Sequence, residues 1–245
     1  MDIRTFVFAG RPDLHRQADT IFSADWPEFI FHDPVADRHM ARVREFFQNL
    51  SLLLVDGDDQ IVAGGWGVPV RWDGAIGTLP GGYDDALRQA VELHEEGGRA
   101  DTLVIAAAQV RRDRQGQGLA AQMLRRLADS GEHAGLTRVI APVRPALKAR
   151  YPLTPMGRFM TWTRPDGAPL DPWLRTHHRL GARMLCPAER SMVMTGSVAD
   201  WERWAGMDFP DSGSYVVPGA LAPMVLDRDR DLGELVEPNV WVQHR

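Results

Sequence analysis

The chain has 245 residues, of which 44% are hydrophobic, and a formal net charge of −5 at pH 7. That length and apolar content are sufficient for one large domain with a well-formed core. The acidic balance argues against a nucleic-acid binder that relies on a general basic field, so we expect no nucleic-acid partner.

The cysteine count and the charge pattern indicate the compartment. The single cysteine, Cys186, excludes an internal disulfide and fits a reducing environment, so we expect a cytoplasmic protein. No apolar run approaches the length of a membrane span, and the early charges at Asp2, Arg11 and Asp13 do not fit a secretory signal, so we expect no membrane partner. Lys148 is the single Lys in an Arg-rich chain, which suggests a GC-rich bacterial genome.

The N-terminal part shows strand and helix patterns around one irregular segment. Residues 3–8 alternate like a short strand, and residues 12–21 and 38–49 have the spacing of helices. Between these helices, residues 25–34 contain two prolines and three aromatic residues. The aromatic side chains either line a pocket or anchor the segment to the core, which is their commoner role.

A β-hairpin is predicted next. Strand patterns over 52–55 and 60–70 flank Asp56-Gly57, a favoured turn. Several glycines lie inside the second strand, so we expect a bulge or a close backbone approach there. An insertion starts at residue 79, and its helix, over 85–96, would cover the sheet edge or act as a lid.

The central stretch, residues 102–127, predicts a strand, a glycine loop and a helix. Leu103–Val110 is apolar and suits a buried strand, and apolar residues recur at helical spacing from Leu119 to Leu127. Gly116 and Gly118 lie between them. A helix N-terminus offers unpaired backbone N–H groups to an anion, and glycine lets a phosphate approach closely.

Other readings of this loop exist. An ordinary strand–helix turn would look similar. A Walker loop needs Lys and Ser or Thr after the last glycine, whereas Leu119-Ala120 follow here. A dinucleotide fingerprint is nearly matched, but residues 140–143 provide no acidic residue to bind a ribose.

The rest of the chain predicts one more central strand, over 138–143, and a helix that Asp171 and Pro172 open and Gly181 ends. The remaining elements are a strand, a helix and a pair of strands around a charged turn, over 191–195, 198–204, 223–226 and 235–243.

The phrase Gln115-x-x-Gly118-x-Ala120 after an apolar strand resembles the acyl-CoA signature of the GCN5-related N-acetyltransferase (GNAT) superfamily. Arg112 stands where a proline is common. The helix over 171–182 is similar to the family's fourth helix, with His177 at the usual Tyr position. The resemblance is specific over residues 103–127 and loose over most of the chain.

This resemblance implies an α/β fold with a mixed, mostly antiparallel sheet flanked by helices. A parallel central pair of strands, here 103–110 and 138–143, would splay apart and hold the pantetheine arm of an acyl-CoA. We expect one domain over residues 1–245, with an inserted helix at about 79–98 and an extended C-terminal tail at about 197–245.

The resemblance also implies acetyl-CoA or another acyl-CoA as co-substrate, and no metal. The implied coenzyme-binding residues are Gln109, Val110, Gln115, Gly116, Gln117, Gly118, Leu119 and Ala120. Arg111, Arg112 and Arg114 would meet the coenzyme's phosphates or form a solvated charge run.

Acyl transfer to an amine needs a neutral amine, a polarised carbonyl and a stabilised leaving thiolate. By analogy with the family, the backbone N–H of Gln109 or Val110 would polarise the carbonyl. His177 would assist the departing sulfur as an imidazolium, so its pKa matters. The alternative is that His177 is a solvated helix residue beside His178.

Other side chains have weaker claims to a chemical role. Glu28, His32 and Asp33 lie near the expected acceptor wall and are candidate general bases, alongside a water chain to bulk solvent. Cys186 lacks a spacing motif, and a lone cysteine is more often a buried small hydrophobe. No metal-ligand spacing appears in the sequence.

We therefore expect an N-acetyltransferase that acts on a small-molecule amine by direct attack in a ternary complex, and that could form a homodimer. Three alternatives stay open: a donor with a longer acyl chain or an acyl carrier protein, a non-catalytic acyl-CoA-binding module, and a nucleotide-dependent enzyme that uses the same loop. A long apolar pocket would indicate the longer acyl chain or the carrier protein. The lack of an acceptor pocket would indicate the non-catalytic module, and binding of NAD or ATP would indicate the nucleotide-dependent enzyme.

Overall fold

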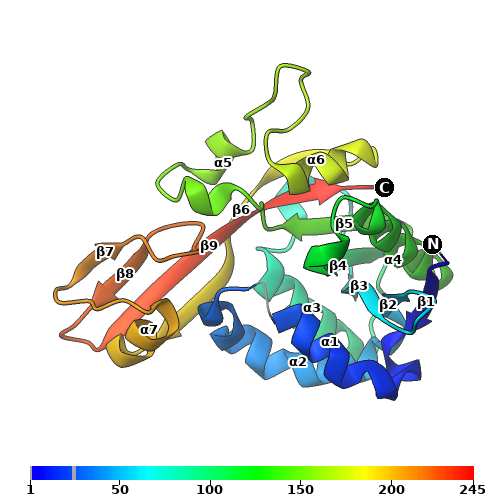
Figure 1. Cartoon of the computed structure of the whole chain (residues 1–245), viewed down its shortest axis with the longest axis horizontal. Coiled ribbons are helices and arrows are strands. Elements are labelled where there is room, and N and C mark those ends of the chain that lie inside the picture. The colour runs from blue at the N-terminus through cyan, green and yellow to red at the C-terminus, as the bar shows by residue number, and fades with distance from the viewer. Residues whose placement is uncertain (1, 24–25) are drawn as a thin grey trace.

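A computed structural model describes residues 2–23 and 26–245. In this part of the chain, nine strands form one sheet in the order β1-β2-β3-β4-β5-β9-β8-β7, and β6 also pairs with β9 (Figure 1). The strands are β1 (Arg4–Val7), β2 (Ser51–Val55), β3 (Ile61–Val70), β4 (Thr102–Val110), β5 (Arg138–Val143), β6 (Arg183–Gly196), β7 (Gly213–Tyr215), β8 (Met224–Asp227) and β9 (Leu232–Gln243).

Helices pack around this sheet. They are α1 (His15–Ser23), α2 (Pro34–Phe46), α3 (Tyr83–Glu95), α4 (Leu119–His133), α5 (Met156–Phe159), α6 (Pro172–Arg179) and α7 (Val198–Ala205). Figure 1 shows α1, α2 and α3 close together, with α5 and α6 on the opposite side of the view. Within the described residues, no helix combines the length and the apolar character that crossing a membrane requires.

The parallel pair β4–β5 splays apart, as the family resemblance implies. The two strands pair only from Thr102↔Arg138 to Val104↔Ile140, and every other strand pair is antiparallel. Beyond Ile105 and Ala141 the strands leave a gap between them. The predicted fold class, a mostly antiparallel sheet with a splayed central pair, is therefore confirmed.

The glycines of β3 let two backbones come close. A Cβ at Gly65 would lie 2.7 Å from the carbonyl oxygen of Ala107, and one at Gly67 would lie 2.6 Å from that of Val104. The register shifts between Trp66 and Gly67, so that β4 bulges beside this point. The predicted bulge with close backbone approach is present.

Side-chain caps fix where several helices begin. Asp33 accepts hydrogen bonds from two backbone N–H groups of α2, and Asp171 does the same for α6. Ser197 and Asp200 form a capping box at the start of α7. Because Asp33 and Pro34 form a strong start signal, α2 begins four residues before the predicted helix at residue 38.

The last strand does not lie at the edge of the sheet. β9 pairs with β5 on one side and with β6 on the other, so residues close to the C-terminus complete the centre of the molecule. β6 is much longer than the predicted strand over 191–195, because two register shifts let it continue past Pro187. β8 and β9 form the predicted pair around the charged turn.

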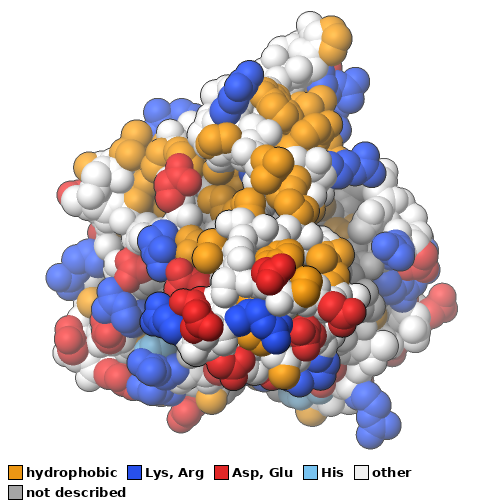
Figure 2. Space-filling view, turned by 90° about the vertical axis from the view of Figure 1, so that its left-hand side faces the viewer, with side chains coloured by type: hydrophobic (Ala, Val, Ile, Leu, Met, Phe, Trp, Pro, Cys, Tyr) orange, Lys and Arg blue, Asp and Glu red, His pale blue; other side chains and the backbone are white. Residues whose placement is uncertain are grey.

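The far end of β9, together with β7, β8 and α7, has its own apolar cluster around Trp201, Phe209 and Leu235. Figure 2 faces this end and shows hydrophobic side chains gathered in its upper part, above a band of mixed charges. Val216 and Val225 are among the exposed hydrophobic residues of the described chain.

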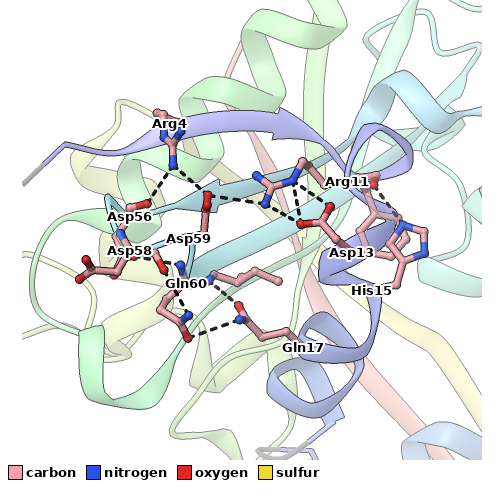
Figure 3. A network of polar contacts seen from close by, with 11 residues as sticks. Arg4, Arg11, Asp13, His15, Gln17, Asp56, Asp58, Asp59 and Gln60 are labelled. Atoms are coloured by element: carbon pink, nitrogen blue, oxygen red, sulfur yellow. Dashed lines mark hydrogen bonds and ion pairs between the residues drawn. The ribbon is translucent and has the colours of Figure 1, made fainter.

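Polar contacts tie the N-terminus to the β2–β3 turn (Figure 3). Arg4 and Arg11 both pair with Asp59, at 2.9 and 3.5 Å, and Gln17 accepts a hydrogen bond from the backbone N–H of Ile61. Exposed ion pairs of this kind stabilise a fold only slightly. Their effect here is to hold β1 and α1 against the hairpin.

Candidate active site

The glycine loop has the conformation of an anion cradle. Gly116 and Gly118 have φ values of +78° and +79°, which glycine adopts far more readily than other residues. A Cβ at either position would meet nothing within 4 Å, so the space over the loop is open. In α4 the N–H of Gln122 bonds to the carbonyl oxygen of Gly118, and the N–H groups before it point out of the helix end.

Arg111 and Arg114, beside the loop, are held by carboxylates. Arg111 pairs with Asp113 at 2.7 Å and also donates to the carbonyl oxygen of Ile61. Arg114 pairs with Asp56, at 3.2 Å, in the β2–β3 turn. These two arginines therefore tie the loop to β3 and to the β2–β3 turn.

A cavity of about 870 Å³ begins at the splay of β4 and β5. It is large enough for a small-molecule acceptor together with the reacting end of a donor. Segments that are far apart in the sequence line it: among them are Trp26, Tyr83, Ile105–Gln109, Ala141–Arg144, His177 and Asn239.

Backbone alternation on β4 decides which N–H groups face the gap. The N–H of Arg111 bonds to Val62 on β3, and in an antiparallel ladder alternate residues point the same way. The N–H of Gln109 therefore faces β3, and those of Val110 and Ala108 face the gap. The family resemblance implies the backbone N–H of Gln109 or Val110 as the group that would polarise the thioester carbonyl. This geometry favours the N–H of Val110 and disagrees with that of Gln109.

The side chain of Gln109 has a different position in the site. It accepts a hydrogen bond from Nε1 of Trp26, at 2.9 Å, and donates to the carbonyl oxygen of Ile21. It thus joins β4 to the N-terminal aromatic segment. In that segment Trp26 and Phe31 line the cavity, whereas Phe29 is fully buried in the core, so both roles considered for its aromatic residues occur.

His177 is buried against the cavity, with 2% of its surface exposed, and is not a solvated helix residue. Its Nδ1 lies 2.8 Å from Nε2 of His244, and its Nε2 has no hydrogen-bond partner among the described residues. Burial, and to a lesser degree His244, lowers the pKa of His177 to about 3. The expected imidazolium is therefore not present at neutral pH, and His177 is a neutral imidazole.

The three candidate bases from the sequence do not reach the cavity. Glu28 and His32 pair with each other at 3.1 Å, and the ring of His32 stacks on Trp204. Asp33 is fully buried as the cap of α2. Among the described residues, the carboxylates that line the cavity are instead Asp19 and Asp37, which no sequence motif marks.

Tyr83 comes from the inserted helix and was not predicted. Its backbone N–H donates to Oγ of Ser191, at 2.9 Å, and its ring meets the edge of Trp66. Burial raises the pKa of Tyr83, so the phenol stays protonated. Within the described chain its hydroxyl makes no hydrogen bond, which leaves it available to a ligand in the cavity.

Arg144 and Asn239 were also missed. Arg144 forms a two-pronged ion pair with the fully buried Glu237, at 2.8 and 2.9 Å, and lies over the ring of Trp26. Asn239 donates to Ser191 and to the carbonyl oxygen of Pro142, and its Oδ1 has no partner in the described part of the chain. The positions of both side chains in the cavity depend on the pairing of β5 with β9.

A carboxyl pair supports α3 behind Tyr83. Oδ2 of Asp84 accepts the N–H of Val193, and Asp84 also contacts Asp33. Burial and the hydrogen bond to Asp33 raise the pKa of Asp84 well above its usual range. Oδ2 of Asp33 and Oδ1 of Asp84 have no other hydrogen-bond partner among the described residues. One proton shared between the two carboxyl groups satisfies both of these oxygens.

The remaining candidate, Cys186, is partly buried in β6, and burial raises the pKa of its thiol. This environment does not produce a thiolate nucleophile. The described residues contain no group of three or more His, Cys, Asp or Glu that could hold a metal ion.

Comparison with known proteins agrees with this geometry. A model of the acetyltransferase (GNAT) family matches residues 18–153, more than half of the chain. The arginine N-acetyltransferase avaD of Aspergillus versicolor is 29% identical over 270 residues, covering 96% of this chain and 91% of avaD.

Solved structures with the same fold include the loading GNATL domain of CurA from Lyngbya majuscula, with a TM-score of 0.62 and 16% identity. The GphF GNAT-like decarboxylase in complex with isobutyryl-CoA has a TM-score of 0.57 and 14% identity. In both comparisons 100% of this chain and 98% of the other are covered. The splayed strands, the glycine loop and the family match together show that this chain belongs to the acetyltransferase (GNAT) family and is an acyltransferase.

Proposed function

We propose that this enzyme transfers the acetyl group of acetyl-CoA to the amine of a small molecule by direct attack in a ternary complex. The observation that carries the proposal is one continuous cavity that starts at the β4–β5 gap and extends to the N-terminal aromatic segment and α3. A donor entering from the gap and an acceptor entering from the other side would meet inside it.

Each part of the site has a role in this proposal. The N–H groups of Gly116 to Ala120 bind the phosphates of the coenzyme, and the side of β4 that faces the gap pairs with its pantetheine amides. The N–H of Val110 or Ala108 polarises the thioester carbonyl as negative charge develops on its oxygen. His177 and Tyr83 bring a neutral imidazole and a phenol to the cavity wall.

The charges of the cavity wall favour a polar acceptor. Asp19 and Asp37 provide carboxylates for a cationic group, and Arg44 provides a guanidinium for an anionic one. The relative avaD is named as an arginine N-acetyltransferase, so arginine is the first acceptor to examine. Either carboxylate, or a water chain from it, removes the proton from the attacking amine.

The test is acceptor-dependent release of CoA thiol from acetyl-CoA by the purified full chain. Arginine, agmatine, lysine and aromatic amines serve as acceptors, and mass spectrometry identifies the acetylated product. We expect thiol release only with an accepted amine and one added acetyl group in the product. A folded protein that binds CoA but acetylates none of these amines, with either acetyl-CoA or longer acyl-CoA donors, would contradict the proposal.

A further inference from the structure

The pair formed by His177 and His244 connects the cavity with the end of the last strand. Nδ1 of His177 lies 2.8 Å from Nε2 of His244, so the two rings share one hydrogen bond. The other ring nitrogen of His177, Nε2, is buried at the cavity wall without a partner among the described residues. A buried polar atom in this situation is satisfied by a ligand or by a bound water molecule.

Both rings are held firmly in place. Asp171 caps α6 and also accepts the N–H of Leu147, while the indole of Trp173 meets the ring of His177 with centroids 4.6 Å apart. The backbone N–H of His244 donates to Val139 on β5, at 2.9 Å. The distance between the two imidazoles is therefore set by the sheet and by the cap of α6.

The number of protons limits the arrangements of this pair. Burial lowers the pKa of His177 to about 3 and that of His244 to about 4, so both rings are neutral near pH 7. A neutral imidazole carries one N–H, and the contact between the rings needs one donor. Either His244 donates and His177 has an N–H at the cavity, or His177 donates and has a lone pair there.

We propose that His244 is a positioning residue: its Nε2–H donates to Nδ1 of His177, and this fixes the proton of His177 on Nε2, facing the cavity. The reaction favours this arrangement over the reverse one. Negative charge develops on the carbonyl oxygen and on the sulfur during acyl transfer, and an N–H stabilises it whereas a lone pair repels it. Neutral imidazole is known to act as such a donor in other enzymes.

This inference rests on the proposed acyl transfer. The amine nitrogen bonds to the carbonyl carbon, the carbon–sulfur bond breaks, and its electron pair goes to sulfur. The amine loses its proton to water or to a carboxylate. His177 keeps its own proton and holds the thiolate by a hydrogen bond, so His244 orients a donor and transfers nothing.

The first test measures the tautomer directly and does not depend on activity. Long-range proton–nitrogen spectra of the full chain, labelled at its eight histidines, distinguish protonated from unprotonated ring nitrogens. The His177→Gln variant identifies the signals of His177. We expect Nε2 of His177 to be protonated and Nδ1 unprotonated, and the opposite assignment would overturn the proposal whether or not the enzyme acetylates arginine.

The second test uses a matched pair of variants. His244→Gln keeps an N–H donor at the end of the side chain, and His244→Leu removes it. We expect kcat to fall roughly tenfold or more in the Leu variant, through loss of the productive tautomer, with the KM for acetyl-CoA unchanged. The Gln variant should recover most of kcat, and equal kcat values in two folded variants would contradict the positioning role.

Discussion

The two sides of the cavity are built in different ways. In the proposed function the donor side, formed by β4, the glycine loop and α4, comes from one continuous stretch and binds the coenzyme through backbone N–H groups. The acceptor side is assembled from Trp26, Tyr83, Arg144 and Asn239, and its polar groups are side chains. The comparison indicates that the donor side suits one coenzyme through a local motif, whereas the acceptor side takes its specificity from long-range packing.

The largest effect is expected when the donor side is blocked. Gly118→Asp places a carboxylate in the anion cradle, so we expect CoA affinity to fall by more than about 100-fold, which corresponds to roughly 2.7 kcal/mol. Calorimetric titration with CoA measures this.

Gly135→Asp is the matched control, because Gly135 also has a positive φ, of 81°, and open space around it, but lies beyond the other end of α4. Both substitutions carry the same kind of backbone strain. Equal CoA affinities in the two folded variants would show that the loop does not bind the coenzyme.

The next effect concerns His177, which lines the cavity between the two sides. His177→Phe keeps a ring of similar size and removes the N–H, so we expect kcat to fall about 100-fold while CoA affinity stays unchanged. Steady-state kinetics with acetyl-CoA and calorimetry together give both quantities. The adjacent, exposed His178 provides the control, and His178→Phe should leave kcat unaltered.

A smaller effect is expected on the acceptor side. Tyr83→Phe removes a cavity hydroxyl, and losing one hydrogen bond should lower kcat/KM for the acceptor by roughly 3-fold to 10-fold. The KM for acetyl-CoA should stay as in the wild type. Tyr215→Phe is a suitable control, because the hydroxyl of Tyr215 bonds to Asp211 at the far end of the molecule. If Tyr83→Phe changes the KM for acetyl-CoA instead, Tyr83 belongs to the donor side.

The smallest effect concerns the support of α3 and its dependence on pH. The folded protein keeps a proton on Asp84 above the pH at which an unfolded aspartate, with a pKa of about 3.9, loses it. Stability from this group is therefore present at low pH and is lost as the pH rises through the raised pKa of Asp84. Asp84→Asn should reduce the fall in Tm between about pH 5 and pH 9, by roughly 2–4 °C for each kcal/mol involved.

The neighbouring Asp85 is the control for this effect. The hydrogen bond from the backbone N–H of Gly81 and the contacts with Arg88 outweigh the effect of burial and lower the pKa of Asp85, so its charge does not change above about pH 5. Asp85→Asn should therefore leave the slope of Tm between about pH 5 and pH 9 as it is in the wild type. The same slope in wild type and Asp84→Asn would mean that Asp84 does not carry the shared proton.

What could be predicted from the sequence follows the same division. The glycine loop and the cap of α6 are set by residues close together in the chain, and local patterns indicated them, whereas the splayed strands were implied by the family resemblance. His177 was found only through the family resemblance, and its neutral state depends on burial by Trp173 and on His244, which lies more than sixty residues away.

The acceptor side could not be predicted for a physical reason. Arg144 and Asn239 reach the cavity because β9 returns to pair with β5, and Tyr83 is held there because Gly82 lets α3 start against Ser191. Glu28 and His32 looked equally suitable in the sequence, yet the 3₁₀ turn over Glu28–His32 pairs them with each other. Which polar side chains reach the cavity therefore depends on which segments meet in space.

One measurement tests the central claim most directly: calorimetric titration of the purified wild-type chain with CoA and acetyl-CoA, with NAD and ATP as controls. The glycine loop and the β4–β5 gap predict one binding site per chain for the CoA species and none for NAD or ATP. Binding of NAD or ATP without binding of CoA, in a folded sample, would contradict the assignment of the loop and of the whole donor side.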